Sequence, residues 1–217
     1  MKITLVSEIS IDGKLTKARG ETSRDLVNMV PEIFSKDIHK QRAINDAILV
    51  GANTVRTDNP NLTNRHFGNK QPIRIIISNS LLFYLVYNIF NDKTETIIVT
   101  SSKNRYNPII EKIINKGKKC VFSGEDKVNI SDMINQLEKE FGIKSLIIEG
   151  GGETNFEFFK EGLIDEIIIY VLPTIIGGKN NVTLVDGDEH NILNNEFSLE
   201  EYSVQDNCIR LHYKRNK

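Results

Sequence analysis

Short runs of β-branched and aliphatic residues recur along this chain, with room for one helix between neighbouring runs, and this alternation constrains the fold most. In the middle of the chain the runs are Thr96–Ser101, Lys119–Ser123, Lys144–Glu149 and Ile164–Leu172. The last contains six apolar residues in succession, a pattern typical of a strand buried on both faces. Strands joined through helices form right-handed βαβ units, so the sequence predicts an α/β fold with a mostly parallel sheet.

The intervening segments carry helix signals. Asn107 followed by Pro108 predicts a helix start, isoleucines then recur at helical spacing, and Gly117 predicts the end. Ser131 is expected to cap a helix that ends at Gly142, and Ser35 one that runs towards Asn45. A short helix is expected over 153–162.

The two ends of the chain fit the same plan. Strands are expected at Ile3–Ile9, Ala47–Val50 and Ile73–Ile77. Near the C-terminus, 199–204 and 208–213 flank Gln205-Asp206-Asn207, which predicts an antiparallel hairpin. No repeat, low-complexity tract or linker divides the sequence, so one domain over residues 1–217 is expected.

Composition excludes several classes of protein. Lys plus Arg number 28 against 29 for Asp plus Glu, so no strong field favours nucleic acid or an anionic membrane. Cys120 and Cys208 form no CxxC pair and are expected to be small buried residues. The N-terminal apolar run is interrupted by Ser7 and Glu8, which favours a strand over a signal peptide, and no run is long enough to span a membrane. We therefore expect a cytoplasmic protein.

The strongest local signal is Glu149-Gly150-Gly151-Gly152 with Thr154, placed directly after an expected strand. Glycines allow close approach of a phosphate to the backbone, and the N–H groups that open the next helix face the anion. The spacing differs from the GxGxxG of dinucleotide-binding Rossmann folds. A tight turn without a ligand remains the alternative.

Other polar loops follow neighbouring strands. Gly177 and Gly178 follow one strand, Gly51 to Thr54 follow another with Asp58 beyond, and Asp12 to Lys14 follow the first. Each could be a simple turn. Together they predict a ligand cleft at the carboxyl edge of the sheet, where open α/β sheets bind their ligands.

The remaining polar residues support no hydrolytic or metal chemistry. His39, His66, His190 and His212 show no HxxxH spacing, and each is expected to be a surface or capping residue. No nucleophile motif appears, and acidic pairs such as Asp188-Glu189 are typical of solvated surface.

Taken in order, these motifs resemble the riboflavin-biosynthesis reductases, whose fold is that of dihydrofolate reductase. The resemblance rests on Ser10-Ile-Asp-Gly-Lys14, His39-Lys-Gln-Arg42-Ala, Val50-Gly-Ala-Asn-Thr54 continuing to Asp58-Asn-Pro-Asn-Leu-Thr63, and Glu149-Gly-Gly-Gly with Asp165-Glu166 and Ile176-Gly-Gly-Lys179. It covers nearly the whole chain. It implies a homodimer that uses NADPH, with NADH possible, to reduce a pyrimidine ribosylamine 5′-phosphate at the ribose C1′.

The resemblance also implies roles for particular residues. Lys14, Asp58 and Glu149 would form the catalytic group, and Asp12, Arg42, Thr63 and Arg65 would bind the substrate, with the arginines on its phosphate. The cofactor would lie against Gly51, Thr54, Ser78, Ser101, Gly150, Gly151, Gly152, Thr154, Gly177 and Gly178. No HxE…PCxxC signature is present, so the fused zinc deaminase of many bacterial relatives is not expected.

Three alternatives stay open at this point. The substrate could be the deaminated pyrimidine, or the chain could be a pterin reductase similar to dihydrofolate reductase. A non-catalytic nucleotide-binding regulator is the third, since fold does not fix function. Two segments also depart from the family pattern. Leu81–Phe90 is apolar and is expected to be dimer surface or a strand packed on the core, and Arg19–Phe34 is long enough to act as a flap.

Overall fold

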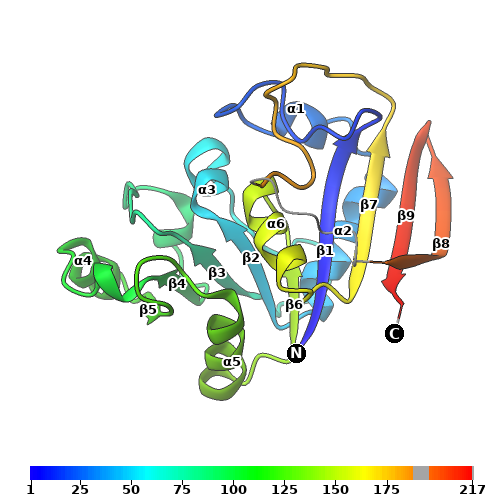
Figure 1. Ribbon diagram of the computed structural model, residues 1–217. Helices are drawn as coiled ribbons and strands as arrows, with labels where there is room; N and C mark the ends of the chain where they lie inside the picture. The colour runs from blue at the N-terminus through cyan, green and yellow to red at the C-terminus, as the bar shows by residue number, and fades with distance from the viewer. Residues whose placement is uncertain (188–195, 217) are drawn as a thin grey trace.

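The computed structural model describes residues 1–187 and 196–216; His190 and the pair Asp188-Glu189 therefore lie outside the described residues. Within these ranges a single sheet of nine strands runs through the molecule in the order β5-β4-β3-β2-β6-β1-β7-β9-β8 (Figure 1). The strands are β1 (Lys2–Ser10), β2 (Ala47–Gly51), β3 (Ile73–Ile77), β4 (Thr96–Thr100), β5 (Lys119–Phe122), β6 (Ser145–Ile148), β7 (Glu166–Leu172), β8 (Phe197–Gln205) and β9 (Cys208–Arg215).

The pairing of the strands confirms the predicted topology. The seven strands from β5 to β7 are parallel, and β9 then pairs antiparallel with β7 and with β8. At the hairpin tip Gln205 pairs with Cys208, and Asp206 and Asn207 both take positive φ, 48° and 63°. Two successive residues of that conformation make the tight turn that fits the twist of a hairpin.

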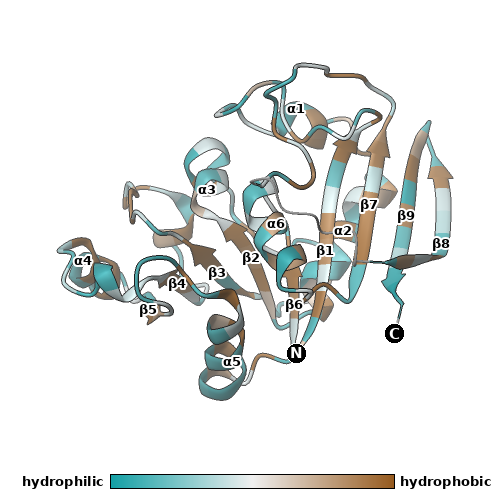
Figure 2. Cartoon of the chain, viewed as in Figure 1, coloured by the Kyte–Doolittle hydropathy of each residue, from teal (hydrophilic) through white to brown (hydrophobic). Residues whose placement is uncertain are grey.

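Helices cover both faces of the sheet. They are α1 (Arg24–Val27), α2 (Glu32–Ile44), α3 (Ala52–Asp58), α4 (Ile109–Asn115), α5 (Ile130–Phe141) and α6 (Gly152–Lys160), with 3-10 turns η1 (Asn88–Phe90) and η2 (Ser102–Asn104). Figure 1 shows α2 behind the sheet and α5 and α6 in front of it. The apolar side chains divide accordingly into two clusters, one including Ile38 of α2 and the other Leu137 of α5 and Phe158 of α6. Figure 2 shows that the central strands between these layers are mostly hydrophobic.

Two predicted helix caps are wrong. Ser35 lies inside α2, which begins after Pro31, and the backbone N–H of Ser35 bonds to the Pro31 carbonyl. Asn129, not Ser131, caps α5, because its side chain accepts from the N–H of Asp132 at 2.8 Å. In both cases a second residue suited to a helix start lies a few positions earlier. By contrast, Gly142 ends α5 in the left-handed conformation as predicted.

Three segments have a structure other than the one expected from the sequence. The helix α3 replaces the turn expected after β2, and Asn59, at φ 42°, ends it just before Pro60. The segment 81–90 is not a strand: Leu81 and Phe90 are buried in the core while Tyr84 is exposed. The segment 19–34 contains α1, and Leu26 anchors it in the core.

The cysteines are both free, as expected, and Cys208 is buried while Cys120 is half-buried. No helix within 1–187 and 196–216 is both long and apolar enough to cross a bilayer.

Candidate active site

The carboxyl ends of six adjacent strands form one edge of the sheet, and the residues singled out from the sequence follow that edge in order. Ser101 follows β4, Ser78 follows β3, Gly51 ends β2, Glu149 follows β6, and Lys14 lies in the loop after β1. Gly177 lies beyond the end of β7. The prediction that these loops share one edge is confirmed by the strand order.

At the centre of the edge, Glu149 forms a two-point ion pair with Arg42 of α2. Arg42 donates from Nε to Oε1 at 2.7 Å and from Nη2 to Oε2 at 2.6 Å. Both side chains are largely buried, with 16% and 14% of their surfaces exposed. Such forked, charge-assisted bonds fix both groups in orientation. Arg42 also donates from Nη1 to the Thr63 carbonyl at 3.2 Å, so much of its donor capacity is used within the chain.

The glycines of the edge let two helix starts approach each other. A Cβ added to Gly51 would lie 2.5 Å from Oγ1 of Thr154, and one added to Gly151 would lie 3.7 Å from Oγ1 of Thr54. A Cβ on Gly152 would lie 2.5 Å from the Thr183 carbonyl oxygen. The peptide bond between Gly150 and Gly151 is cis.

Backbone N–H groups are therefore presented at this point from two neighbouring elements. The helices α3 and α6 begin directly after Gly51 and Gly151, and no described side chain caps either start. Uncapped N-terminal N–H groups attract anions. The two helix starts therefore present N–H donors that suit a phosphate group.

The two serines along the edge differ. Ser78 accepts from the N–H of Leu81 at 2.9 Å and so closes its own loop. Ser101 is completely buried, and its hydroxyl has no partner among the described residues. A buried hydroxyl without a protein partner is uncommon, and this one is available to bond a ligand.

Asp58, expected to be catalytic, is held at the end of α3. It accepts from the backbone N–H and the hydroxyl of Ser23, at 3.1 and 2.9 Å, and its carbonyl accepts from Arg24 at 3.0 Å. The segment expected to be a flap is therefore docked on this carboxylate. Lys14 is half-buried, its backbone is bridged to Thr183, and its ammonium group forms no ion pair with a described residue.

Asp12, expected to bind substrate, holds two loops together. It accepts from Ser10 Oγ at 2.6 Å and from the N–H groups of Ile176 and Gly177 at 3.1 and 2.7 Å. These bonds, that of Ser10 first, lower the pKa of Asp12 to about 2. Gly177 and Gly178 take φ 70° and 79°, which explains why glycine stands at both positions.

A basic corner lies beside Arg42. His39 is buried, which corrects its assignment as a surface residue; its Nδ1 lies 3.1 Å from the Thr63 carbonyl, and its ring meets that of His66 edge-on. Burial first, then the charges of Arg42 and Arg65, lower the pKa of His39 to about 4. Arg65 itself is exposed and forms no ion pair within the described ranges.

Glu8 is the site residue that sequence reasoning missed. It lies inside β1, and its electrostatic neighbours are Glu149, Arg42 and Asp58. A carboxylate in the interior of a strand, between Ser7 and Ile9, was the available signal.

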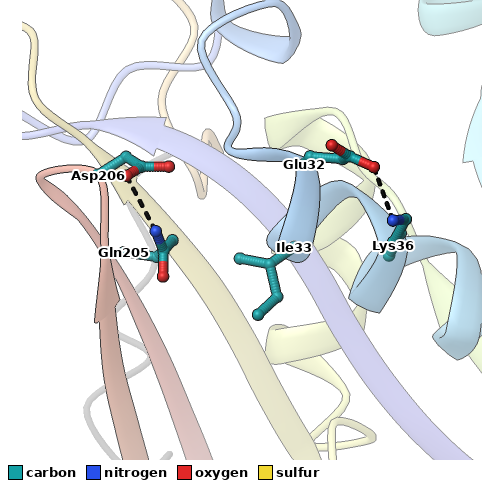
Figure 3. A pocket seen from close by; sticks show the side chains of 5 residues that line it. All are labelled: Glu32, Ile33, Lys36, Gln205 and Asp206. Atoms are coloured by element: carbon teal, nitrogen blue, oxygen red, sulfur yellow. Dashed lines mark hydrogen bonds and ion pairs between the residues drawn. The ribbon is translucent and has the colours of Figure 1, made fainter.

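A shallow cavity of about 380 Å³ lies elsewhere, between the start of α2 and the turn of the β8–β9 hairpin (Figure 3). Its lining is Glu32, Ile33, Lys36, Gln205 and Asp206, where Glu32 pairs with Lys36. None of the residues singled out above lines it, so we place the candidate site at the strand edge.

Known proteins resemble this chain over nearly its whole length. Residues 1–207 match the family described as the RibD C-terminal domain. The chain is 37% identical over 215 residues to the 2,5-diamino-6-ribosylamino-4(3H)-pyrimidinone 5′-phosphate reductase of Aquifex aeolicus, covering 99% of this chain and 92% of that protein. It is 28% identical to the protein of the same name from Methanothermobacter thermautotrophicus, with coverage of 99% and 91%.

Solved structures share the fold. RibD of Acinetobacter baumannii superposes with a TM-score of 0.82 at 24% identity, over 99% of this chain and 58% of that one. The riboflavin biosynthesis reductase Rib7 of Saccharomyces cerevisiae superposes with a TM-score of 0.72 at 21% identity, over 99% and 90%.

Proposed function

Because this chain belongs to the family of the RibD C-terminal domain, we propose that it reduces 2,5-diamino-6-ribosylamino-4(3H)-pyrimidinone 5′-phosphate to the ribitylamine in riboflavin biosynthesis. The observation that carries the proposal is the buried Arg42–Glu149 pair placed directly before the glycine cradle at the start of α6. The protein part of a cofactor-dependent reductase binds and orients the cofactor against the substrate, and a carboxylate fixed beside helix starts that face an anion can serve that purpose.

A reductase of this family uses a nicotinamide cofactor, and the residues fit one. The uncapped starts of α3 and α6 would take a pyrophosphate, with Gly51, Thr54, Gly150 to Gly152 and Thr154 around it. The hydroxyl of Ser101, which has no partner in the part of the chain that the structure describes, supports an additional contact at the end of β4, two strands from β2. When bound, the nicotinamide would supply a hydride. We propose NADPH as the donor, with NADH as the alternative.

For the substrate we propose a position at the carboxyl edge of the sheet, beside the Arg42–Glu149 pair. Glu149 and Lys14 would lie at its ribose, and Asp58 would hold Ser23 and Arg24 of the 19–34 segment close by. Of the two arginines expected at the 5′-phosphate, Arg42 is engaged with Glu149 and Thr63, whereas Arg65 forms no ion pair with any described residue and is proposed to bind the phosphate. Orientation and exclusion of water would supply most of the acceleration.

The proposal is tested by following nicotinamide absorbance with purified chain and two substrates. We expect turnover with the diaminopyrimidinone, because relatives that the chain covers over 92% and 91% of their length carry that name. The 5-amino-6-(phosphoribosylamino)uracil is the competing substrate, and dihydrofolate is the control. Preference for the uracil compound would overturn the substrate assignment, and no turnover with either pyrimidine would overturn the function.

The resemblance to the family further leads us to propose a homodimer in the cytoplasm. Light scattering on a size-exclusion column gives the mass directly, and a value near twice 24.7 kDa is expected.

A further inference from the structure

The strand β1 carries Glu8 on the face that points towards α2. Val6, two residues earlier, belongs to the apolar cluster on that face, and so does Tyr170, the partner of Glu8 across β7. The adjacent strand on the other side, β6, pairs Ile148 with Leu5, so Glu149 follows next to Val6. Glu8 and Glu149 therefore share one face of the sheet at its carboxyl edge.

The charged groups that act on Glu8 include more carboxyls than cations. Glu149 comes from the end of β6, Arg42 from α2 and Asp58 from α3, while the hydroxyl of Tyr170 on β7 donates to Asp37 at 2.7 Å. Asp37 in turn is paired with Arg210 of β9. Among the groups that act on Glu8 there are thus two other carboxyls and one guanidinium.

The charged groups near Glu8 are bonded to other residues. Arg42 is committed to Glu149, and Asp58 is satisfied by Ser23. Within the described residues, the carboxylate of Glu8 forms no ion pair, and its one hydrogen bond is from its own backbone N–H. The side chain of Glu8 is half-buried, so a substrate can reach it. Burial first, and then the charge of Glu149, raise the pKa of Glu8 to about 7. A carboxyl in such a position is well populated as the neutral acid near neutral pH.

We propose that Glu8 is the proton donor of the reduction. This inference rests on the function proposed above, whose reaction adds a hydride and one proton to the substrate. As the C1′–O4′ bond of the closed ribosylamine breaks, the lone pair of the nitrogen forms the C1′=N bond and the proton of Glu8 goes to O4′. The hydride then forms the new C1′–H bond, and the electrons of the C=N bond return to nitrogen. Water returns a proton to the Glu8 carboxylate after product leaves.

The pH dependence of turnover tests this role. We expect kcat/KM of the native chain to fall about tenfold per unit above about pH 7, because the acid form is lost. Glu8→Gln should lower kcat by about 10²-fold near pH 6 and leave KM within a few-fold. It should also abolish the fall of kcat/KM above about pH 7. The matched control is Glu166→Gln, which removes a carboxyl at the first residue of β7, away from the carboxyl edge of the sheet. In this variant kcat/KM should still fall above about pH 7.

Infrared difference spectroscopy supplies a readout that needs no turnover. The carbonyl band of a protonated carboxylic acid should disappear as the pH is raised through about 7, and the titrating band should be absent from Glu8→Gln. The donor role alone is overturned if the native chain is active but kcat/KM of Glu8→Gln still falls above pH 7. It is also overturned if the titrating carbonyl band remains in Glu8→Gln. A native chain that turns over neither pyrimidine overturns the proposed function and the donor role with it.

Discussion

Arg42 and Glu149 lie 107 positions apart in the chain and meet through two hydrogen bonds of 2.7 and 2.6 Å in a largely buried setting. The pair ties α2 to the end of β6. It also fixes the direction of the carboxylate at the point where the glycine cradle begins.

Removing one member of this pair should cost stability as well as activity. We expect Glu149→Gln to lower the free energy of unfolding by about 3 kcal/mol, because it leaves the guanidinium buried without its counter-charge. Replacing both members with apolar residues, as in Arg42→Met with Glu149→Leu, should recover most of that loss without restoring activity. Urea denaturation measures both.

The control for that pair is Glu32→Gln, which breaks the exposed ion pair between Glu32 and Lys36 on α2. Its cost in free energy of unfolding should be small beside that of Glu149→Gln, because exposed ion pairs contribute little to stability. Equal losses for Glu32→Gln and Glu149→Gln would show that the buried pair has no special role in the fold.

Gly51 offers a steric test of the cradle. Its φ of −75° is open to any residue, so Gly51→Ala acts only through the new Cβ, placed 2.5 Å from Thr154 Oγ1. We expect a loss of about 1–3 kcal/mol in stability and about tenfold weaker binding of NADPH, because the starts of α3 and α6 must move apart. Thr154→Ala in the same chain should restore much of both, and Thr154→Ala alone is the control. Binding is measured by calorimetry; a double variant as weak as Gly51→Ala would contradict the steric explanation.

The edge of the sheet could be predicted because its signals are local. A β-branched run followed by glycine or serine marks a strand end, and parallel strands bring such ends together, as at Gly51, Ser101 and Gly150. The Arg42–Glu149 pair could not be found this way, because it depends on how α2 lies on the sheet. Glu8 was missed for a related reason, since nothing in the pattern of β1 says which of its faces lines a site.

The predictions of helix boundaries were wrong for a different reason. Asn129 and Ser131 have similar capping preferences, and only the observed bond to Asp132 decides between them. In α3 the buried residues are Ala52 and Val55, and the rest is polar, so its helical period is too weak to be read from sequence.

The buried imidazole of His39 predicts loss of stability in acid. Burial and the nearby arginines lower the pKa of His39 to about 4, against 6.5 for the free side chain. The unfolded chain therefore takes up a proton first, and the stability from this group is present above pH 6.5 and lost as the pH falls towards 4. We expect this to account for about 2 kcal/mol between pH 7 and pH 5. In His39→Gln the free energy of unfolding should no longer fall by this amount between pH 7 and pH 5, whereas in His212→Gln, on β9, it should still do so. Denaturation curves at the two pH values measure the difference.

Glu8 should act on stability in the opposite direction. Its pKa is raised from 4.5 to about 7, so the folded chain holds a proton that the unfolded chain releases. Its contribution is most favourable below pH 4.5 and is lost as the pH rises through about 7, which leaves the native chain destabilised in alkali. Glu8→Gln, which cannot ionise, should therefore raise the free energy of unfolding by about 3 kcal/mol at pH 8 and by about 1 kcal/mol at pH 5. Glu166→Gln should not stabilise the chain, because Lys2 and His212 outweigh burial and lower the pKa of Glu166. If Glu8→Gln gains the same stability at both pH values, the carboxyl does not hold its proton in the folded chain.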